Sequence, residues 1–223
     1  MINAVDLVLA VAGPSRAGLP RLGWLSRCER PAVTAVCSRL GVDVEVVDPG
    51  DLDALTVGPD RGRRWGLLTA DAGSVPSHDL DRFEHLARRR GAAVANAAAL
   101  RLAAEPVAAL DALAAAGFPT TVGGAPDGSR HRATVARRPS GWWQPVPAAD
   151  GPAAPERAVD LAVAVADGLD VAGVVAVEVV AAPHGDVLVE SVRVGPDPHD
   201  PASVAAHVRG LLDLPLGEGP AAS

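Results

Sequence analysis

Short apolar segments alternate with amphipathic segments along the chain, and this alternation predicts its secondary structure. In the first 121 residues, apolar runs typical of buried strands are separated by loops and by helices that carry Pro, Ser or Gly at their ends. The predicted strands cover residues 5–11, 43–47, 65–69 and 92–95, and the predicted helices cover residues 31–40, 78–90 and 106–116. Strands that alternate with helices favour a parallel sheet covered by helices.

The pattern changes after residue 121. Residues 130–138 alternate basic with small or apolar side chains, as in a half-buried strand. Beyond a segment rich in Pro, Gly and Ala, the chain predicts a helix at 156–167, strands at 174–180 and 187–192 joined by a turn, and a last helix at 201–212. We therefore predict an α/β fold with an N-terminal parallel-sheet subdomain (1–121), a C-terminal mixed α/β subdomain (130–216) and a flexible tail (217–223).

Composition excludes several classes of protein. The net charge of −7 does not favour broad contact with nucleic acid or with an anionic membrane. No apolar run approaches the roughly 18 residues that a membrane span needs, and the N-terminal segment lacks the basic region of a signal peptide. Cys28 and Cys37 are too few for a disulfide framework or a zinc site. We expect a soluble, cytoplasmic protein with reduced thiols and a core of small aliphatic side chains.

Several motifs, taken in their order along the chain, resemble those of ATP-grasp ligases of the glutathione-synthetase type. The sequence DVEVVDPGDL (43–52) resembles the first domain of that family, and a strand that ends at Asn96, followed by AAGFPTT (115–121), resembles its linker. GLDVAGV (168–174), then Glu178 and Glu190 on either side of a glycine turn, resemble its catalytic hairpin. The ending LLDLPLG (211–217) is similar to that of carboxyaminoimidazole ribonucleotide synthases.

Two features depart from the pattern of that family. All 20 basic residues are arginine, whereas the resemblance implies a lysine on the nucleotide phosphates, and arginine does not replace lysine freely. In addition, residues 122–129 lead from the linker directly to the strand at 130–138. The resemblance therefore implies that the ATP-binding lid subdomain is missing.

Glu178 and Glu190 are the candidate metal ligands. They lie twelve positions apart on two strands that meet at a turn, so their carboxylates should be close together. The resemblance implies that they hold magnesium against ATP, a role that suits oxygen ligands, although the family's asparagine beside the second glutamate is absent. The alternative is an inherited acidic pair that faces solvent or pairs with Arg193, Arg137 or Arg138.

The arginines of the C-terminal half form a second candidate site. Guanidinium groups match carboxylate and phosphate in shape, so Arg137, Arg138 and Arg193 are candidates for binding an anion. Arg130 and Arg132, on the same predicted strand, could line the same cleft. The alternative is a solvated face of that strand.

Other candidate sites have simpler structural explanations. The loop at 13–18 follows a predicted strand but lacks the spacing and the lysine of a phosphate-binding loop. Asp200 and His207, with Ser203 as the nearest nucleophile, could form a catalytic group, but Asp200 also suits the cap of the last helix.

Trp142 and Trp143 are adjacent on a segment that we expect to be extended, so their side chains should point to opposite sides. One could fill the core where the lid subdomain is missing. The other could cover a ligand or a partner surface.

Two functions follow from these residues. The first is a truncated, non-catalytic ATP-grasp-like protein that needs no cofactor and binds a protein partner or a small acidic ligand. The alternative is a trimmed ATP-dependent carboxylate–amine ligase that forms an acyl phosphate, uses ATP and magnesium, and has Arg137 or Arg138 in place of the lysine.

Overall fold

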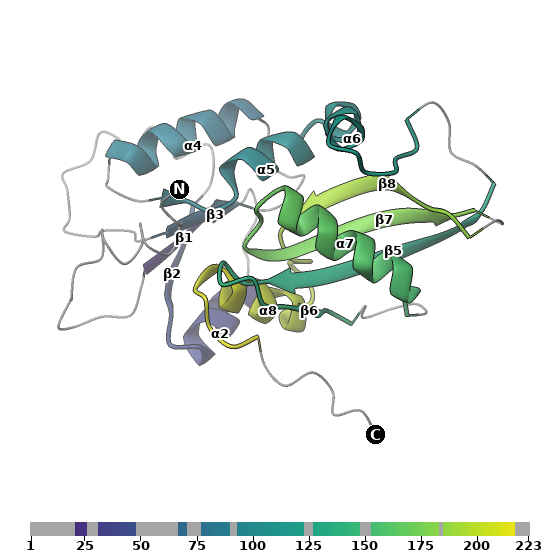
Figure 1. Cartoon of the computed structure of the whole chain (residues 1–223). Helices are drawn as coiled ribbons and strands as arrows, with labels where there is room; N and C mark the ends of the chain where they lie inside the picture. The colour runs from purple at the N-terminus through teal and green to yellow at the C-terminus, as the bar shows by residue number, and fades with distance from the viewer. Residues whose placement is uncertain are drawn as a thin grey trace, which may run out of the picture.

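The computed structural model describes residues 21–25, 31–47, 67–70, 77–89, 93–122, 127–147, 153–182 and 185–216. These residues form two four-stranded sheets with helices packed against them (Figure 1). The predicted strand at 5–11, the loop at 13–18 and the tail at 217–223 lie outside the described residues.

The first sheet is entirely parallel, with the strand order β2-β1-β3-β4. Its strands are β1 (Arg21–Leu25), β2 (Asp43–Val47), β3 (Leu67–Ala70) and β4 (Ala93–Val94). The predicted parallel sheet is therefore confirmed, but β1 was not predicted. In β1, Arg21 and Gly23 interrupt the apolar run, and only burial of Leu22 and Trp24 marks it as a strand at the centre of the sheet.

Four helices belong to this half of the chain: α2 (Pro31–Arg39), α4 (Ser77–Arg89), α5 (Ala97–Ala103) and α6 (Pro106–Ala115). Helices α2 and α4 pack against strands of the parallel sheet, whereas α5 and α6 pack against β8 (Val187–Val194) of the second sheet. Their ends carry the residues expected from the sequence. Gly41 and Gly117, which follow α2 and α6, adopt φ angles of 70° and 89°, and only glycine adopts this left-handed region at little cost.

The second sheet is antiparallel, with the strand order β6-β5-β7-β8. Its strands are β5 (Ser129–Arg137), β6 (Trp143–Pro145), β7 (Gly173–Ala181) and β8 (Val187–Val194). Helix α7 (Glu156–Gly168) covers one face, and α8 (Pro201–Leu211) packs against one end of the other (Figure 1). The predicted mixed α/β half is thus confirmed in its order of elements.

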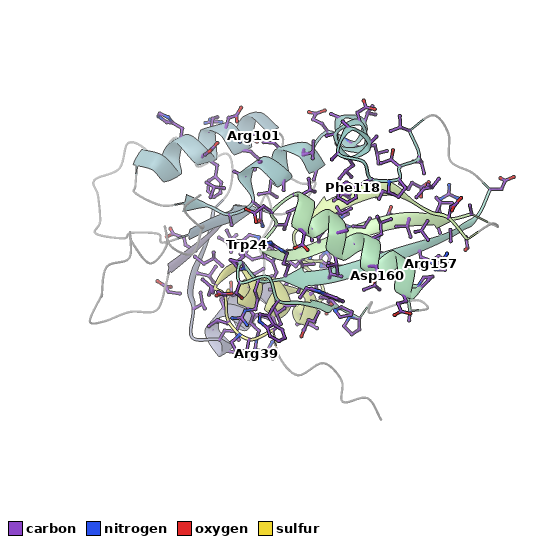
Figure 2. All side chains as sticks on the ribbon, viewed as in Figure 1. Trp24, Arg39, Arg101, Phe118, Arg157 and Asp160 are labelled. Carbon is purple, nitrogen blue, oxygen red and sulfur yellow. The ribbon has the colours of Figure 1, made fainter. Side chains whose placement is uncertain are left out.

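The core is built from small aliphatic residues and crosses between the two sheets. One cluster joins valines of β5, β7 and β8 to α7 and also to Phe83 of α4 and Leu113 of α6. A second cluster joins Leu22 and Trp24 of β1 to Val208 of α8. Figure 2 labels Trp24 where the two halves meet. Helix α8, although last in the chain, therefore contributes to the core of the first sheet.

Within the described ranges, no helix combines the length and the apolar character needed to cross a membrane.

Candidate functional site

One face of the antiparallel sheet carries the candidate residues, because directly opposed residues of antiparallel strands share a face. The face toward α7 is lined by buried valines. The opposite face, beyond the end that α8 covers, presents polar and charged side chains. We call the part formed by Arg130, Arg132, Thr134, Ala176, Glu178, Glu190, Ser191 and Arg193 the polar face. Two apolar residues, Val180 and Leu188, lie on the same side of the sheet in register with Arg130.

Glu178 lies at the centre of the polar face and has two hydrogen-bonding partners. Arg132 Nη2 donates to Glu178 Oε1 at 2.7 Å, and Ser191 Oγ donates to Oε2 at 3.0 Å. The hydrogen bond from Arg132 lowers the pKa of Glu178, and the bond from Ser191 and the charge of Arg193 act in the same direction against the effect of burial. Glu178 is therefore held as a carboxylate by groups of this chain.

Glu190 reaches the polar face through a β-bulge. Glu178 pairs with Ser191 while the next residue, Val179, pairs with Val189, so Glu190 is the extra residue of β8. Arg130 Nε donates to its two carboxylate oxygens at 3.0 and 2.9 Å, and Nη2 donates to Oε1 at 2.9 Å. This carboxylate too is paired with a guanidinium group.

The structure therefore brings Glu178 and Glu190 to one face, as the turn between their strands suggested, but their partners differ from those expected. The sequence pointed to Arg193, Arg137 or Arg138, whereas the paired arginines are Arg130 and Arg132 of β5. The register of β5 on β7, which sets Arg132 opposite Glu178, decides this pairing. Among the described residues, no group of three or more His, Cys, Asp or Glu side chains could hold a metal ion.

Arg137 and Arg138 lie elsewhere and serve structural contacts. Arg137 pairs with Asp167 of α7 at 2.5 Å and donates to the Val171 carbonyl at 3.0 Å. Arg138 donates to the Oδ1 and carbonyl oxygens of Asp213 at 3.0 and 2.7 Å. Because β5 residues alternate between faces, Arg137 belongs to the face toward α7 and not to the polar face.

Arg193 is the one of the three predicted anion-binding arginines that the structure places on the polar face. It is half-buried on β8, opposite Ala176 of β7. Its charge helps to lower the pKa of Glu178, yet in the part of the chain that the structure describes it forms neither a hydrogen bond nor an ion pair.

Trp142 and Trp143 do not fill the core. Trp142, in the turn before β6, is 69% exposed, and Trp143, the first residue of β6, is 41% exposed. The buried position on this segment belongs to Val146, which packs with Ala136 and Val174. The expectation that one tryptophan plugs the core is wrong, because the small side chains of α8 already close that end of the sheet.

The residues around the last helix support the structural interpretation. Asp200 caps α8, accepting hydrogen bonds from the Ala202 and Ser203 amides at 2.9 and 3.2 Å. His207 is fully buried: its Nδ1 accepts from the Val174 amide at 2.9 Å, and its ring meets Trp24 edge to face. Cys37 is also buried, which raises the pKa of its thiol to about 11 and makes it a poor nucleophile.

Comparison with known proteins identifies the fold. No protein-family model matches this sequence, and no curated protein matches it. Several solved structures match over most of the chain. The N5-carboxyaminoimidazole ribonucleotide synthetase of Thermotoga maritima matches with a TM-score of 0.66 and 16% identity, over 89% of this chain and 77% of that one.

Two further solved structures match this chain to a similar extent. The phosphoribosylaminoimidazole carboxylase ATPase subunit of Aquifex aeolicus has a TM-score of 0.67 and 13% identity, over 88% of this chain and 78% of that one. The N5-carboxyaminoimidazole synthetase of Staphylococcus aureus complexed with ADP has a TM-score of 0.68 and 12% identity, over 91% of this chain and 80% of that one. The chain therefore has the fold of these ATP-grasp enzymes, which confirms the resemblance seen in the sequence.

Proposed function

We propose that this chain is a non-catalytic binding protein built on the ATP-grasp fold. The observation that carries the proposal is the pairing of both hairpin glutamates with arginines of β5, Glu178 with Arg132 and Glu190 with Arg130. A carboxylate pair that serves a magnesium ion must offer its charge to that ion, and these carboxylates are already neutralised.

Charge favours the same conclusion. The polar face holds three arginines and two glutamates, so its formal charge is +1 and not the −2 of the two glutamates alone. The exposed ion pairs themselves are weak, at about 0–1 kcal/mol each, and a cation could separate them. The guanidinium groups would nevertheless remain beside the incoming ion and repel it, and magnesium loses its own water reluctantly. The residues present thus do not fit a magnesium–ATP site.

The connection between the two halves also supports the proposal. Residues 119–121 run along the outer edge of β8, where the Thr121 amide donates to the Val189 carbonyl at 3.0 Å. Only residues 122–128 separate this edge from β5. Such a segment is too short to form a subdomain that covers a nucleotide and excludes water from it.

Calorimetric titration of ATP and magnesium into the full chain tests the proposal. We expect no saturable heat and no release of ADP. Saturable binding at micromolar nucleotide would contradict it.

A gain-of-function variant sharpens this test. The double substitution Arg130→Ala and Arg132→Ala frees both carboxylates and changes the formal charge of the polar face from +1 to −1. We expect this variant to bind Mn²⁺, used as a spectroscopic substitute for magnesium, at least tenfold more tightly than the parent. Adding Glu178→Gln to the double variant should remove the gain in affinity for Mn²⁺.

A second candidate is the ATP-dependent carboxylate–amine ligase with ATP and magnesium as cofactors. The observation that favours it is the similarity of fold to a synthetase solved with ADP. Glu178 and Glu190 would then be the metal ligands. In this case Glu178→Gln should abolish ADP release in an assay that contains a carboxylic acid, an amine and ATP, whereas the exposed Arg39→Gln should leave it unchanged.

A further inference from the structure

One row of side chains across the polar face has no role in the ion pairs described above. Thr134 of β5, Ala176 of β7 and Arg193 of β8 are paired in register, so they lie side by side on the same face. Neighbouring strands are about 4.8 Å apart, which separates the backbones at Thr134 and Arg193 by roughly 10 Å. Between them stands only the methyl group of Ala176.

Arg193 differs from the other described arginines because it is half-buried and yet forms no hydrogen bond or ion pair with the described residues. Among the arginines whose side chains the structure describes, only Arg39 and Arg193 have no hydrogen bond or ion pair. Arg39 is exposed on α2, where water solvates it, but Arg193 is half-buried. A cation that is partly removed from water and donates no hydrogen bond is unfavourable, and a bound anion would relieve that cost.

The nearest carboxylate cannot serve as that anion. Glu178 stands in the next row, and its two oxygens already accept hydrogen bonds from Arg132 and from Ser191. Because Arg132 neutralises Glu178, the carboxylate also repels an incoming anion less than a free one would.

Thr134 supplies a second donor in the same row. Thr134 is half-buried, and within the described ranges its hydroxyl has no hydrogen-bonding partner. A guanidinium fork and a hydroxyl on one face of the sheet, with an alanine between them in the same row, suit an oxyanion, which accepts several hydrogen bonds at once.

We propose that Arg193 and Thr134 form a subsite for the carboxylate or phosphate group of a small ligand, bound above Ala176 without a metal ion. This inference rests on the proposed function, since it names the chemistry of the small acidic ligand. The ligand is bound through charge-assisted hydrogen bonds from Arg193 and a neutral one from Thr134, and the neighbouring ion pairs fix the rim of the subsite.

The test is calorimetric titration of the full chain with inorganic phosphate, and separately with acetate, in the presence of EDTA. We expect saturable binding of at least one anion. Arg193→Gln should weaken it about tenfold or more, and Thr134→Val about threefold or more, because charged donors contribute more than neutral ones. Arg39, which Figure 2 labels, lies on α2. Arg39→Gln removes the same charge there and should change the affinity for the anion less than twofold.

Each result of the anion titration either supports or overturns the proposed subsite. Binding of phosphate alone or of acetate alone supports the subsite and identifies its ligand class. Absence of binding by both anions, a requirement for added magnesium, or an equal loss in Arg39→Gln overturns the subsite. Circular dichroism and thermal melting verify that each variant is folded.

Failure of the subsite is distinguishable from failure of the proposed function. If ATP and magnesium also fail to bind, the non-catalytic assignment stands while the subsite is rejected. If the chain turns over ATP, the proposed function fails, whatever the anion titration in EDTA shows.

Discussion

Arginine placement on β5 decides the character of the polar face. Arg130 and Arg132 point to the same face because they are two positions apart on a strand, and the register sets them beside Glu178 and Glu190. Had β5 been shifted by one residue, His131 and Ala133 would face the glutamates and both arginines would point toward α7. The pairing is therefore a property of residue positions within the sheet as much as of residue type.

The pH dependence of stability reports the pairing of Glu178. Its pKa lies below the ordinary value of 4.5, so it stabilises the native state above that pH, and the contribution is lost as pH falls through the lowered pKa. Arg132→Gln removes the main cause of the shift. We expect the variant to be less stable than the parent by up to about 1 kcal/mol at pH 7, with a smaller difference at pH 3.

Thermal melting at both pH values checks this expectation. Arg157→Gln is the matched control, because Arg157 donates to the Gly185 carbonyl and, among the described residues, to no carboxylate. A destabilisation by Arg132→Gln that stays constant from pH 7 to pH 3 would mean that its ion pair with Glu178 does not stabilise the fold.

At the scale of single elements, α8 has a well-defined N-terminal cap and lies unusually close to the antiparallel sheet near its C-terminal end. Asp200 accepts hydrogen bonds from two free amides of the first turn, and Pro201 occupies a position where its missing amide costs nothing. Near its other end, Gly210 lies against the backbone of β5 and β7. Both features are local, but only the cap can be read from neighbouring residues in the sequence.

The cap of α8 gives the first prediction at this scale. Asp200→Ala leaves the Ala202 and Ser203 amides without their acceptor and should lower the free energy of unfolding by about 1 kcal/mol. Asp200→Asn retains an acceptor oxygen and should cost much less. Urea denaturation of the three proteins measures the difference, and equal losses in both variants would show that the charge matters and the cap does not.

The close approach of Gly210 to the sheet backbone gives the second prediction at this scale. A Cβ at this position would lie 2.6 Å from the Gly173 Cα and 2.7 Å from the Arg137 carbonyl oxygen, and both are backbone atoms that cannot move aside. Gly210→Ala should therefore destabilise the fold by about 1–3 kcal/mol, even though alanine is the better helix former by about 1 kcal/mol.

Ala112→Gly, in the interior of α6, measures that intrinsic preference, because Ala112 is exposed. A Gly210→Ala variant that is more stable than the parent in urea would show that α8 lies farther from the sheet.

At the scale of the whole molecule, specific polar and aromatic contacts reinforce the shared core that attaches the parallel sheet to the antiparallel one. Asn96, two residues beyond the end of β4, donates from Nδ2 to the Ala172 carbonyl and accepts at Oδ1 from the Ala172 amide, both at 2.8 Å. His207 of α8 contacts Trp24 of the first sheet and the Val174 amide of the second. These contacts fix one half against the other and leave the polar face free of α8 at its far end.

Asn96 offers a direct test of that attachment. It adopts a φ of 59°, in the left-handed region that asparagine tolerates better than alanine. Asn96→Ala should lower the free energy of unfolding by about 2–4 kcal/mol, from two lost hydrogen bonds and the added strain. Asn96→Gly loses the hydrogen bonds without the strain and should cost about 1 kcal/mol less; denaturation curves in which alanine is tolerated better than glycine would contradict this reading of the backbone.

The sequence by itself determined the order of most helices and strands, the caps and stops of the helices, and the resemblance to the ATP-grasp fold. These features depend on neighbouring residues, as with Asp200 before Pro201 or Gly117 after α6. Strand β1 escaped prediction because only its central place in the sheet buries Leu22 and Trp24. The tertiary structure alone decided that Arg130 and Arg132 meet the glutamates, that Arg137 faces α7, and that Arg193 forms no hydrogen bond or ion pair with the described residues. The reason is that strand register joins residues 13 to 60 positions apart, and no local pattern encodes it.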